Sequence, residues 1–298
     1  MNSRITSGQT IGIFAPSSSI VAERFNAGID ILHNRGFKTI IHPQTYTGAD
    51  TGNQFAGTPQ QKATALMDLW TDKNVDAIMA ACGGNTASQF LYLLDFDILE
   101  HHPKPMMGFS DTTALLTALY TKNGNAGFFA PTVQTLGRIE NLDTVFNVLS
   151  GNADTTINLT GAEIIKTGKT EAAPIFAATF SVLMSLAGTH YFPNLSGHIL
   201  VLEDVGEELN NLDRMLWQLY QIIPFPLLSG LVFGHYADTK DTGRPFGLDF
   251  DGIINKYTAH LEIPVLKNTP IGHGTHLCPI PLGRKSVLDA TNRNLILL

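Results

Sequence analysis

Short apolar runs alternate with segments of helical spacing through the first half of the chain. Residues 11–15 form an apolar run that ends at a proline and three serines, which predicts a buried strand followed by a loop. From residue 20 to about residue 35 the apolar positions recur at helical spacing, so we expect a helix there. The same alternation predicts strands at 39–41, 77–81 and 104–109 and helices at 59–72, after residue 85 and at 112–122. Such alternation is typical of parallel sheets covered on both faces, so we predict an α/β fold with an N-terminal doubly wound, flavodoxin-like sheet.

The alternation of apolar runs and helical spacing is lost between about residues 149 and 174, where Gly, Asn, Asp and Thr predominate. We therefore predict a first domain at 1–150, a linker at 151–173 and a second domain at 174–298. Within the second domain the pattern predicts helices at 179–187 and 209–221, a strand at 199–202 and an apolar segment at 228–233. These elements indicate a smaller C-terminal α/β domain.

The composition is that of a folded globular protein. Hydrophobic residues make up 44% of the 298 residues and charged residues 15%, with a mean hydropathy of +0.07, which is apolar enough to bury substantial cores. The 19 basic and 26 acidic residues give a net charge of −7. Because no Lys/Arg cluster supplies the positive surface that a phosphate backbone requires, we expect no nucleic-acid partner.

Targeting and cysteine patterns indicate a cytoplasmic protein. The first ten residues lack the apolar core of a signal peptide, and no apolar run approaches the roughly 18 residues of a membrane span. We therefore expect no membrane contact. Cys82 and Cys278 stand far apart and outside any Cys-x-x-Cys pattern, which indicates reduced thiols and neither a disulfide framework nor a zinc site.

Three polar or Gly-rich segments follow predicted strands, where open α/β sheets bind their ligands: residues 16–19, 82–86 and 110–113. Ser110 is the sharpest candidate, because a strand runs into it and a helix leaves at once, the context that raises a nucleophilic serine above a sheet. The N–H of Asp111 would then lie at a helix N-terminus and help to stabilise an oxyanion. Thr112, however, replaces the second glycine of the Gly-x-Ser-x-Gly pattern. On spacing alone, Ser110 is more often a helix N-cap.

The glycine pair Gly83-Gly84 also follows a predicted strand. Glycine lets the backbone approach a ligand, so this pair can supply a second oxyanion donor, although a tight turn has the same pattern. The pair is too short for a dinucleotide-binding Gly-x-Gly-x-x-Gly or a P-loop, and neither motif occurs elsewhere in the chain.

A nucleophilic serine needs a base, and His273 lies between two glycines in a loop of small residues and prolines. With ten histidines in the chain, a loop histidine without a catalytic role is also common. Glu203 closes the strand at 199–202, where a carboxylate can orient an imidazole. Alternatively, it faces solvent or caps the helix that follows.

Together these segments resemble the LD-carboxypeptidase family of serine peptidases. The resemblance spans most of the chain, and three of its motifs occur in the family's order. The matching segments are the opening residues 11–17, the Gly83-Gly84 loop, Pro-Lys-Pro-Met-Met-Gly-Phe-Ser-Asp-Thr-Thr at 103–113, Leu-Glu-Asp-Val-Gly-Glu at 202–207 with Leu-Asp-Arg at 212–214, and Gly-His at 272–273 followed by Pro-Leu-Gly at 281–283.

The resemblance implies a Ser-His-Glu triad in a cleft between the two domains. Ser110 would be the nucleophile, His273 the general base and then acid, and Glu203 the residue that orients the imidazole. The backbone amides of Asp111 and Gly84 would form the oxyanion hole. Gly83 and Asn85 would contact the substrate.

Members of this family are cytoplasmic hydrolases, commonly homodimers, that need no metal or cofactor. Most remove the terminal D-alanine from L,D-linked peptidoglycan tetrapeptides during cell-wall recycling. A related branch cleaves the amide between an aminoacyl group and a nucleotide in microcin C-type antibiotics and thereby confers immunity. The resemblance therefore implies a homodimer without cofactors that acts on a small peptide or a peptidyl-nucleotide.

Several alternatives stay open at this point. Asn85-Thr86 follow the glycines where many carboxypeptidases carry an aromatic residue, which is closer to the immunity branch, and residues 274–280 also depart from the usual pattern. Cys82 follows a strand and is an alternative nucleophile, whereas Cys278 can line the site or simply pack. From a different class, a non-catalytic small-molecule-binding protein would show the same two-domain layout without an aligned triad.

Overall fold

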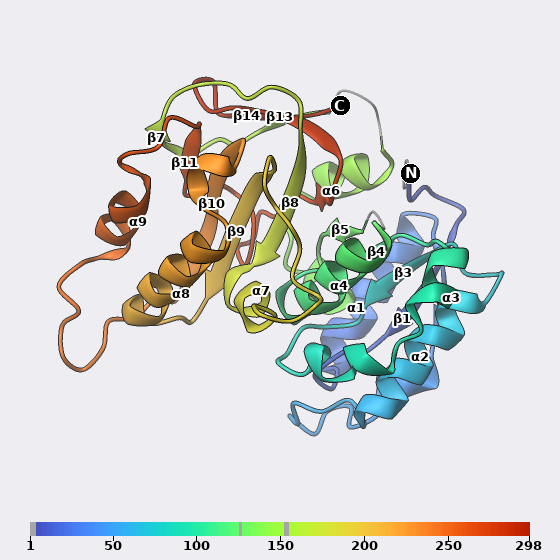
Figure 1. The fold of residues 1–298 in the computed structure, drawn as a ribbon. Coiled ribbons are helices and arrows are strands. Elements are labelled where there is room, and N and C mark those ends of the chain that lie inside the picture. Colours follow the sequence, from blue (N-terminus) through green and yellow to red (C-terminus); the bar gives the residue numbers. More distant parts are fainter. Residues whose placement is uncertain (1–3, 125–126, 152–154) are drawn as a thin grey trace.

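The computed structural model describes residues 4–124, 127–151 and 155–298, which form two β-sheets with helices around them (Figure 1). Residues 1–3 of the N-terminal segment and residues 152–154 of the predicted linker lie outside the described residues. Among the helices that the structure describes, none has the length and apolar character needed to cross a membrane.

The first sheet has the strand order β12-β5-β4-β3-β1-β2. Its strands are β1 (Thr10–Phe14), β2 (Lys38–Ile41), β3 (Ala77–Ala80), β4 (Met106–Gly108), β5 (Phe128–Phe129) and β12 (Ile280–Pro281). Strands β1 to β5 pair in parallel, and β12 from the C-terminal part of the chain adds an antiparallel edge. The order 2-1-3-4-5 is the flavodoxin-like one, so the predicted doubly wound class is confirmed.

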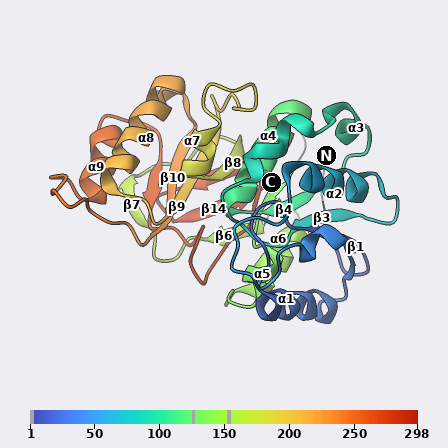
Figure 2. The ribbon, with the colours of Figure 1, turned by 90° about the horizontal axis from the view of Figure 1, so that it is seen from below.

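Helices cover both faces of this sheet, and Figure 2 shows the sheet between them. One face carries α1 (Ala22–Asn34) and α5 (Val133–Leu136), and the other carries α2 (Pro59–Thr71), α3 (Phe96–His101) and α4 (Thr113–Asn123), while α6 (Leu142–Leu149) leads out of the first half. Helix α1 buries Phe25, Ile29 and Leu32, an i, i+4, i+7 stripe that packs on the sheet. Helix α2 starts at a capping box between Thr58 and Gln61, which fixes its first turn.

The second sheet has the order β6-β14-β13-β8-β9-β10-β11-β7. Strands β8 to β11 are parallel, and the flanking strands pair antiparallel to them or to one another. Its strands are β6 (Thr155–Asn158), β7 (Glu163–Lys166), β8 (Ala173–Thr179), β9 (Ile199–Val205), β10 (Gly230–Ala237), β11 (Val265–Lys267), β13 (Lys285–Asp289) and β14 (Asn294–Leu297), and its helices are α7 (Phe180–Ser185), α8 (Leu209–Ile222) and α9 (Phe250–Thr258). This sheet is the mixed α/β second unit that the pattern predicts.

The predicted linker contains two strands of this second sheet, β6 and β7, at its opposite edges. In β6 only Ile157 is buried, because an edge strand keeps most of its side chains in water. Such a segment has the polar composition of a linker. The predicted domain limits themselves stay a prediction.

The carboxyl ends of the two sheets meet between α4 and the end of β8. Helix α4 contacts both β8 and α7. At this junction the backbone N–H of Thr179 donates to Oγ1 of Thr113, at 3.2 Å. Segments that follow β4, β8 and β9 are thereby brought to one place, although they lie far apart in sequence.

Candidate active site

Ser110 sits at a sharp turn between β4 and α4. The preceding residue, Phe109, is extended, whereas Ser110 has a left-handed backbone with φ of +58°. A 3₁₀ turn, η3 (Ser110–Thr112), then leads into the helix. A non-glycine residue in this region costs roughly 1–3 kcal/mol and persists where the surroundings enforce it. This is the strand-turn-helix geometry expected of an exposed nucleophile.

The Gly83-Gly84 loop lies directly against Ser110. A Cβ atom placed on Gly83 would be 2.9 Å from Oγ of Ser110 and 3.9 Å from the backbone N of Asp111, so only glycine fits without a shift. The carbonyl oxygen of Gly83 accepts from the backbone N–H of Ser18, at 3.1 Å. The structure therefore brings Gly83, Ser110 and Asp111 together after the ends of β3 and β4, while Gly84 faces the side chains of Ser17 and Ser18.

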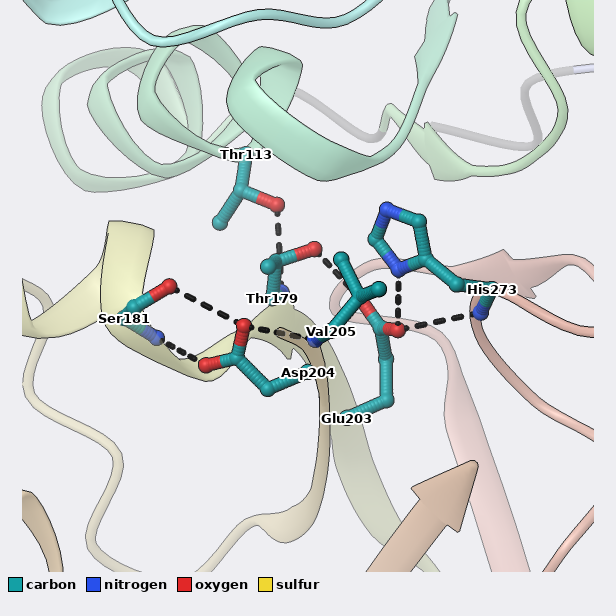
Figure 3. A network of polar contacts seen from close by, with 7 residues as sticks. All are labelled: Thr113, Thr179, Ser181, Glu203, Asp204, Val205 and His273. Carbon is teal, nitrogen blue, oxygen red and sulfur yellow. Dashed lines mark hydrogen bonds and ion pairs between the residues drawn. The ribbon is translucent and has the colours of Figure 1, made fainter. Parts of the chain in front are cut away.

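Glu203 and His273 form a hydrogen-bonded pair at the end of the second sheet (Figure 3). Glu203 lies on β9 and is fully buried, and its Oε2 is 2.7 Å from Nδ1 of His273. The same oxygen accepts from the backbone N–H of His273, at 3.1 Å. Because an ionised carboxylate only accepts, this contact places the ring proton on Nδ1 and leaves Nε2 as an acceptor that faces away from Glu203.

Close packing holds the Glu203 carboxylate in place. Its other oxygen accepts from the hydroxyl of Thr179, which ends β8. Gly272 has φ of +122°, and a Cβ atom there would lie 2.7 Å from Cγ of Glu203. The residue before His273 is therefore glycine for both its backbone conformation and its contact with the carboxylate.

The two halves of the site meet through Phe109 and His273. Their ring centroids lie 4.7 Å apart, so the imidazole packs on the residue that precedes Ser110. The His273–Glu203 pair thus lies against the residue that precedes Ser110, although Glu203 and Phe109 come from different sheets. This arrangement has the components of acyl transfer: a serine on a strained turn, an imidazole with a free acceptor nitrogen, and a buried carboxylate behind it.

The remaining sequence candidates lie around this centre. Asn85 is exposed, and its Nδ2 donates to Oε1 of Gln54, at 2.8 Å. Cys82 is buried with its Sγ 3.0 Å from the carbonyl oxygen of Ser18, and burial raises the pKa of its thiol to about 12. Burial likewise raises the pKa of Cys278 to about 12. Both thiols stay protonated at neutral pH, which makes Cys82 a poor nucleophile.

A second buried carboxylate, Asp204, follows Glu203 on β9 with 2% of its surface exposed. Its oxygens accept from the backbone N–H and the hydroxyl of Ser181 and from the backbone N–H of Val205 (Figure 3). Burial raises the pKa of Asp204 to about 7, against the opposing effect of these backbone hydrogen bonds, and the negative charge of Glu203 adds to the rise.

Two features of the site were not predicted from the sequence. The sequence pattern predicts a helix that begins at Thr179, whereas Thr179 is the last residue of β8 and its hydroxyl donates to Glu203. A polar residue at the end of the apolar run Pro-Ile-Phe-Ala-Ala-Thr is the signal that marks it. The contact between Phe109 and His273 has no such signal, because it depends on how the two sheets pack.

The chain belongs to the LD-carboxypeptidase family. The model of the family's N-terminal domain matches residues 11–130, and that of its C-terminal domain matches residues 172–288. The predicted family is thereby confirmed, and so is the family-level activity, that of an LD-carboxypeptidase.

Curated relatives and solved structures match over nearly the whole chain. The murein tetrapeptide carboxypeptidase of Pseudomonas aeruginosa is 28% identical, over 97% of this chain and 98% of its own length. The microcin C7 self-immunity protein MccF of Escherichia coli is 25% identical, over 97% and 92%. A solved structure of MccF with glutamyl sulfamoyl guanosine covers 99% of this chain and 97% of its own at a TM-score of 0.88 and 22% identity, which shows a shared fold. The muramoyltetrapeptide carboxypeptidase of Oxalobacter formigenes has a TM-score of 0.82 and 25% identity, over 97% and 98%.

Proposed function

We propose that this protein is a serine-type carboxypeptidase that removes the terminal D-alanine from L,D-linked peptidoglycan tetrapeptides, with Ser110, His273 and Glu203 as its triad. The observation that carries the proposal is the 2.7 Å contact between His273 and Glu203, on an imidazole that packs against the residue before Ser110. A binding protein has no need of this alignment. By resemblance to the family, we further propose that the enzyme acts as a cytoplasmic homodimer in cell-wall recycling.

In the proposed mechanism, Oγ of Ser110 attacks the carbonyl carbon of the scissile amide while Nε2 of His273 takes the hydroxyl proton. The buried Glu203 stabilises the imidazolium that forms. The oxyanion receives hydrogen bonds from the backbone amides of Asp111 and Gly84. His273 then gives its proton to the leaving amine as the C–N bond breaks. Water, deprotonated by His273, hydrolyses the acyl-enzyme and restores Ser110.

Replacing Ser110 tests the proposal. In Ser110→Ala we expect binding of the tetrapeptide to persist and its hydrolysis to fall by about 10⁴-fold or more, because the nucleophile is lost. His273→Ala should show a loss of the same order. Release of D-alanine, followed by mass spectrometry, is the measurement.

Cys82→Ala is the matched control, since it removes the neighbouring thiol without touching the triad. We expect it to keep the rate within a few-fold of the wild-type value. Undiminished turnover in Ser110→Ala would contradict the triad, and a large loss in Cys82→Ala would point to the cysteine instead.

A second candidate activity is the hydrolysis of an aminoacyl-nucleotide amide, as in microcin immunity. Two observations favour it: the similarity to MccF over 97% of the chain, and an exposed polar Asn85 beside the glycine pair. Incubation with a tetrapeptide and, separately, with an aspartyl sulfamoyl adenosine distinguishes the two activities by their products. The same triad would serve both reactions.

A further inference from the structure

Lys62 is a buried cation behind the loop that faces Ser110. It lies on α2 with 2% of its surface exposed. Lysines are almost never buried unless their charge is paired, because an ammonium group loses its hydration. Burial indeed lowers the pKa of Lys62, while the negative charge of Asp111 opposes the change. The ammonium group of Lys62 therefore needs hydrogen-bond acceptors and a nearby negative charge.

The ammonium group of Lys62 holds Thr86, the second residue after Gly84. Its Nζ donates to Oγ1 of Thr86, at 2.7 Å. The same hydroxyl lies 3.2 Å from Oγ of Ser17, which also accepts from the backbone N–H of Thr86, at 2.9 Å. All three side chains are buried. Lys62 therefore fixes Thr86 against the loop that follows β1.

Thr86 is also tied to the residue after the nucleophile. Oδ2 of Asp111 accepts from the backbone N–H groups of Thr86 and Ala87, both at 2.7 Å. Asp111 is 4% exposed, so its carboxylate needs these donors and a nearby positive charge. A buried cation and a buried anion thus lie on either side of Thr86, and both hold the end of the glycine loop.

We propose that Lys62 is a positioning residue for the oxyanion hole. It secures Thr86 and balances the charge of Asp111, and thereby keeps the segment 83–87 against Ser110 with the amide of Gly84 in place for the oxyanion. This role rests on the proposed function, in which the amides of Gly84 and Asp111 stabilise the transition state. Lys62 acts through Thr86 and Asp111, and none of its described contacts is with Ser110 itself.

Lys62→Met tests this role, because methionine keeps much of the side-chain volume and removes the charge and the donors. We expect kcat to fall by about 10- to 100-fold with KM within about threefold, since an oxyanion hole acts on the transition state and losing one donor costs about 10²- to 10³-fold. Lys62→Arg, which keeps the charge, should recover part of kcat. The assay uses the L,D-tetrapeptide or the aspartyl sulfamoyl adenosine, whichever the wild-type protein hydrolyses.

Lys104→Met is the matched control. Lys104 is partly buried, and its Nζ donates to the carbonyl oxygens of Leu69 and Asp72 at the other end of α2. Its replacement removes a comparable charge from the same domain without affecting the glycine loop. We expect kcat within twofold of the wild-type value. An equal loss of kcat in both variants would assign Lys62 a merely structural role and overturn the proposal.

Amide hydrogen exchange supplies a readout that needs no substrate. In Lys62→Met we expect the amides of Thr86 and Ala87 to exchange at least about tenfold faster, because the loop loses its anchor while the global fold remains. Thr86→Val removes only the hydroxyl that Lys62 contacts and should give the same kinetic signature, so it carries the test if Lys62→Met does not fold.

Two outcomes would overturn the positioning role: an unchanged kcat in folded Lys62→Met or Thr86→Val, and a lowered kcat with unchanged amide exchange. Failure of the proposed function would look different. Full turnover in Ser110→Ala would refute the proposed triad. The effect of Lys62→Met on the exchange of the Thr86 and Ala87 amides would still be measurable, because it needs no substrate.

Discussion

Ser110, on the first sheet, is held by its backbone conformation, whereas Glu203, on the second sheet, is held by burial. Ser110 has a left-handed backbone, and the glycine loop reaches it through main-chain atoms. Glu203 instead lies in an ordinary extended strand, fully buried, with a hydroxyl, an imidazole and a backbone amide on its oxygens. The first arrangement depends on main-chain geometry, and the second depends on the hydrogen bonds that satisfy a buried carboxyl group. Substitutions in the two halves should therefore differ in how much they lower stability and how much they lower kcat.

Among the glycine substitutions that test this comparison, Gly272→Ala should have the largest effect, because it disturbs the packing around the buried Glu203. The new methyl group would meet Cβ and Cγ of Glu203, and the backbone would be strained at φ of +122°. We expect about 3 kcal/mol less unfolding free energy, from backbone strain and overpacking together. We also expect at least about 10²-fold lower kcat, because His273 is displaced. Chemical denaturation and steady-state kinetics measure the two effects.

Gly247→Ala controls for the backbone strain alone. Gly247 has φ of +91° and nothing within 4 Å of an added Cβ atom. A cost of about 1 kcal/mol with unchanged kcat is expected there, from the left-handed backbone only. If Gly272→Ala behaved like Gly247→Ala, the packing of the carboxylate would not matter to the site.

Gly83→Ala should act mainly on kcat, because it disturbs the half that is held by backbone conformation. The added Cβ atom would lie 2.9 Å from Oγ and 3.0 Å from Cβ of Ser110, so the serine or the loop must shift. We expect kcat to fall by about 10- to 100-fold, since a misplacement of about 1 Å can cost 10²-fold. The unfolding free energy should change by less than about 1 kcal/mol, as the site borders solvent. Gly243→Ala, in open space, is the control, and a large loss of stability in Gly83→Ala would contradict the comparison.

The sequence could predict the parts of the molecule that local pattern determines. The flavodoxin-like sheet and the strands before Ser110 and at Glu203 follow from apolar runs closed by polar residues or glycine, although β9 continues past Glu203 to Val205. Strands β6 and β7 lie within the predicted linker, because their few buried residues give them the polar pattern of a linker. The antiparallel strand β12 could not be placed, because two residues have no periodicity.

In the candidate site, too, the residues marked by local pattern could be predicted, and those that depend on tertiary packing could not. The sequence predicts Ser110, Glu203 and His273 because each follows an apolar run or lies between glycines, in a segment that resembles the family. Lys62 lies inside an amphipathic helix, where a lysine is expected to be exposed. Its burial depends on how α2 packs against the glycine loop, and this tertiary contact leaves no mark on local spacing.

A pH-dependent effect on stability is expected of Asp204, the second buried carboxylate beside Glu203. The pKa of Asp204 is about 7 in the folded protein, against an ordinary value of 3.8. Between about pH 4 and pH 7 the folded state therefore holds a proton that the unfolded state has lost, so stability falls as pH rises through this window. Below the window both states are protonated, and above it both are ionised, so the loss is complete.

Asp204→Asn removes this titration. The unfolding free energy of the wild-type protein relative to Asp204→Asn should decline by up to about 1.4 kcal/mol per pH unit within the window and level off above it. Urea denaturation of both proteins at several pH values measures the difference. Asp30→Asn, at an exposed position of α1, makes the same change of charge and should show a much smaller dependence. A difference that rose with pH would mean that the hydrogen bonds from Ser181 and Val205 outweigh the burial of the carboxylate. In that case Asp204 would belong with groups whose charge the fold stabilises, and burial would not distinguish the second half of the site.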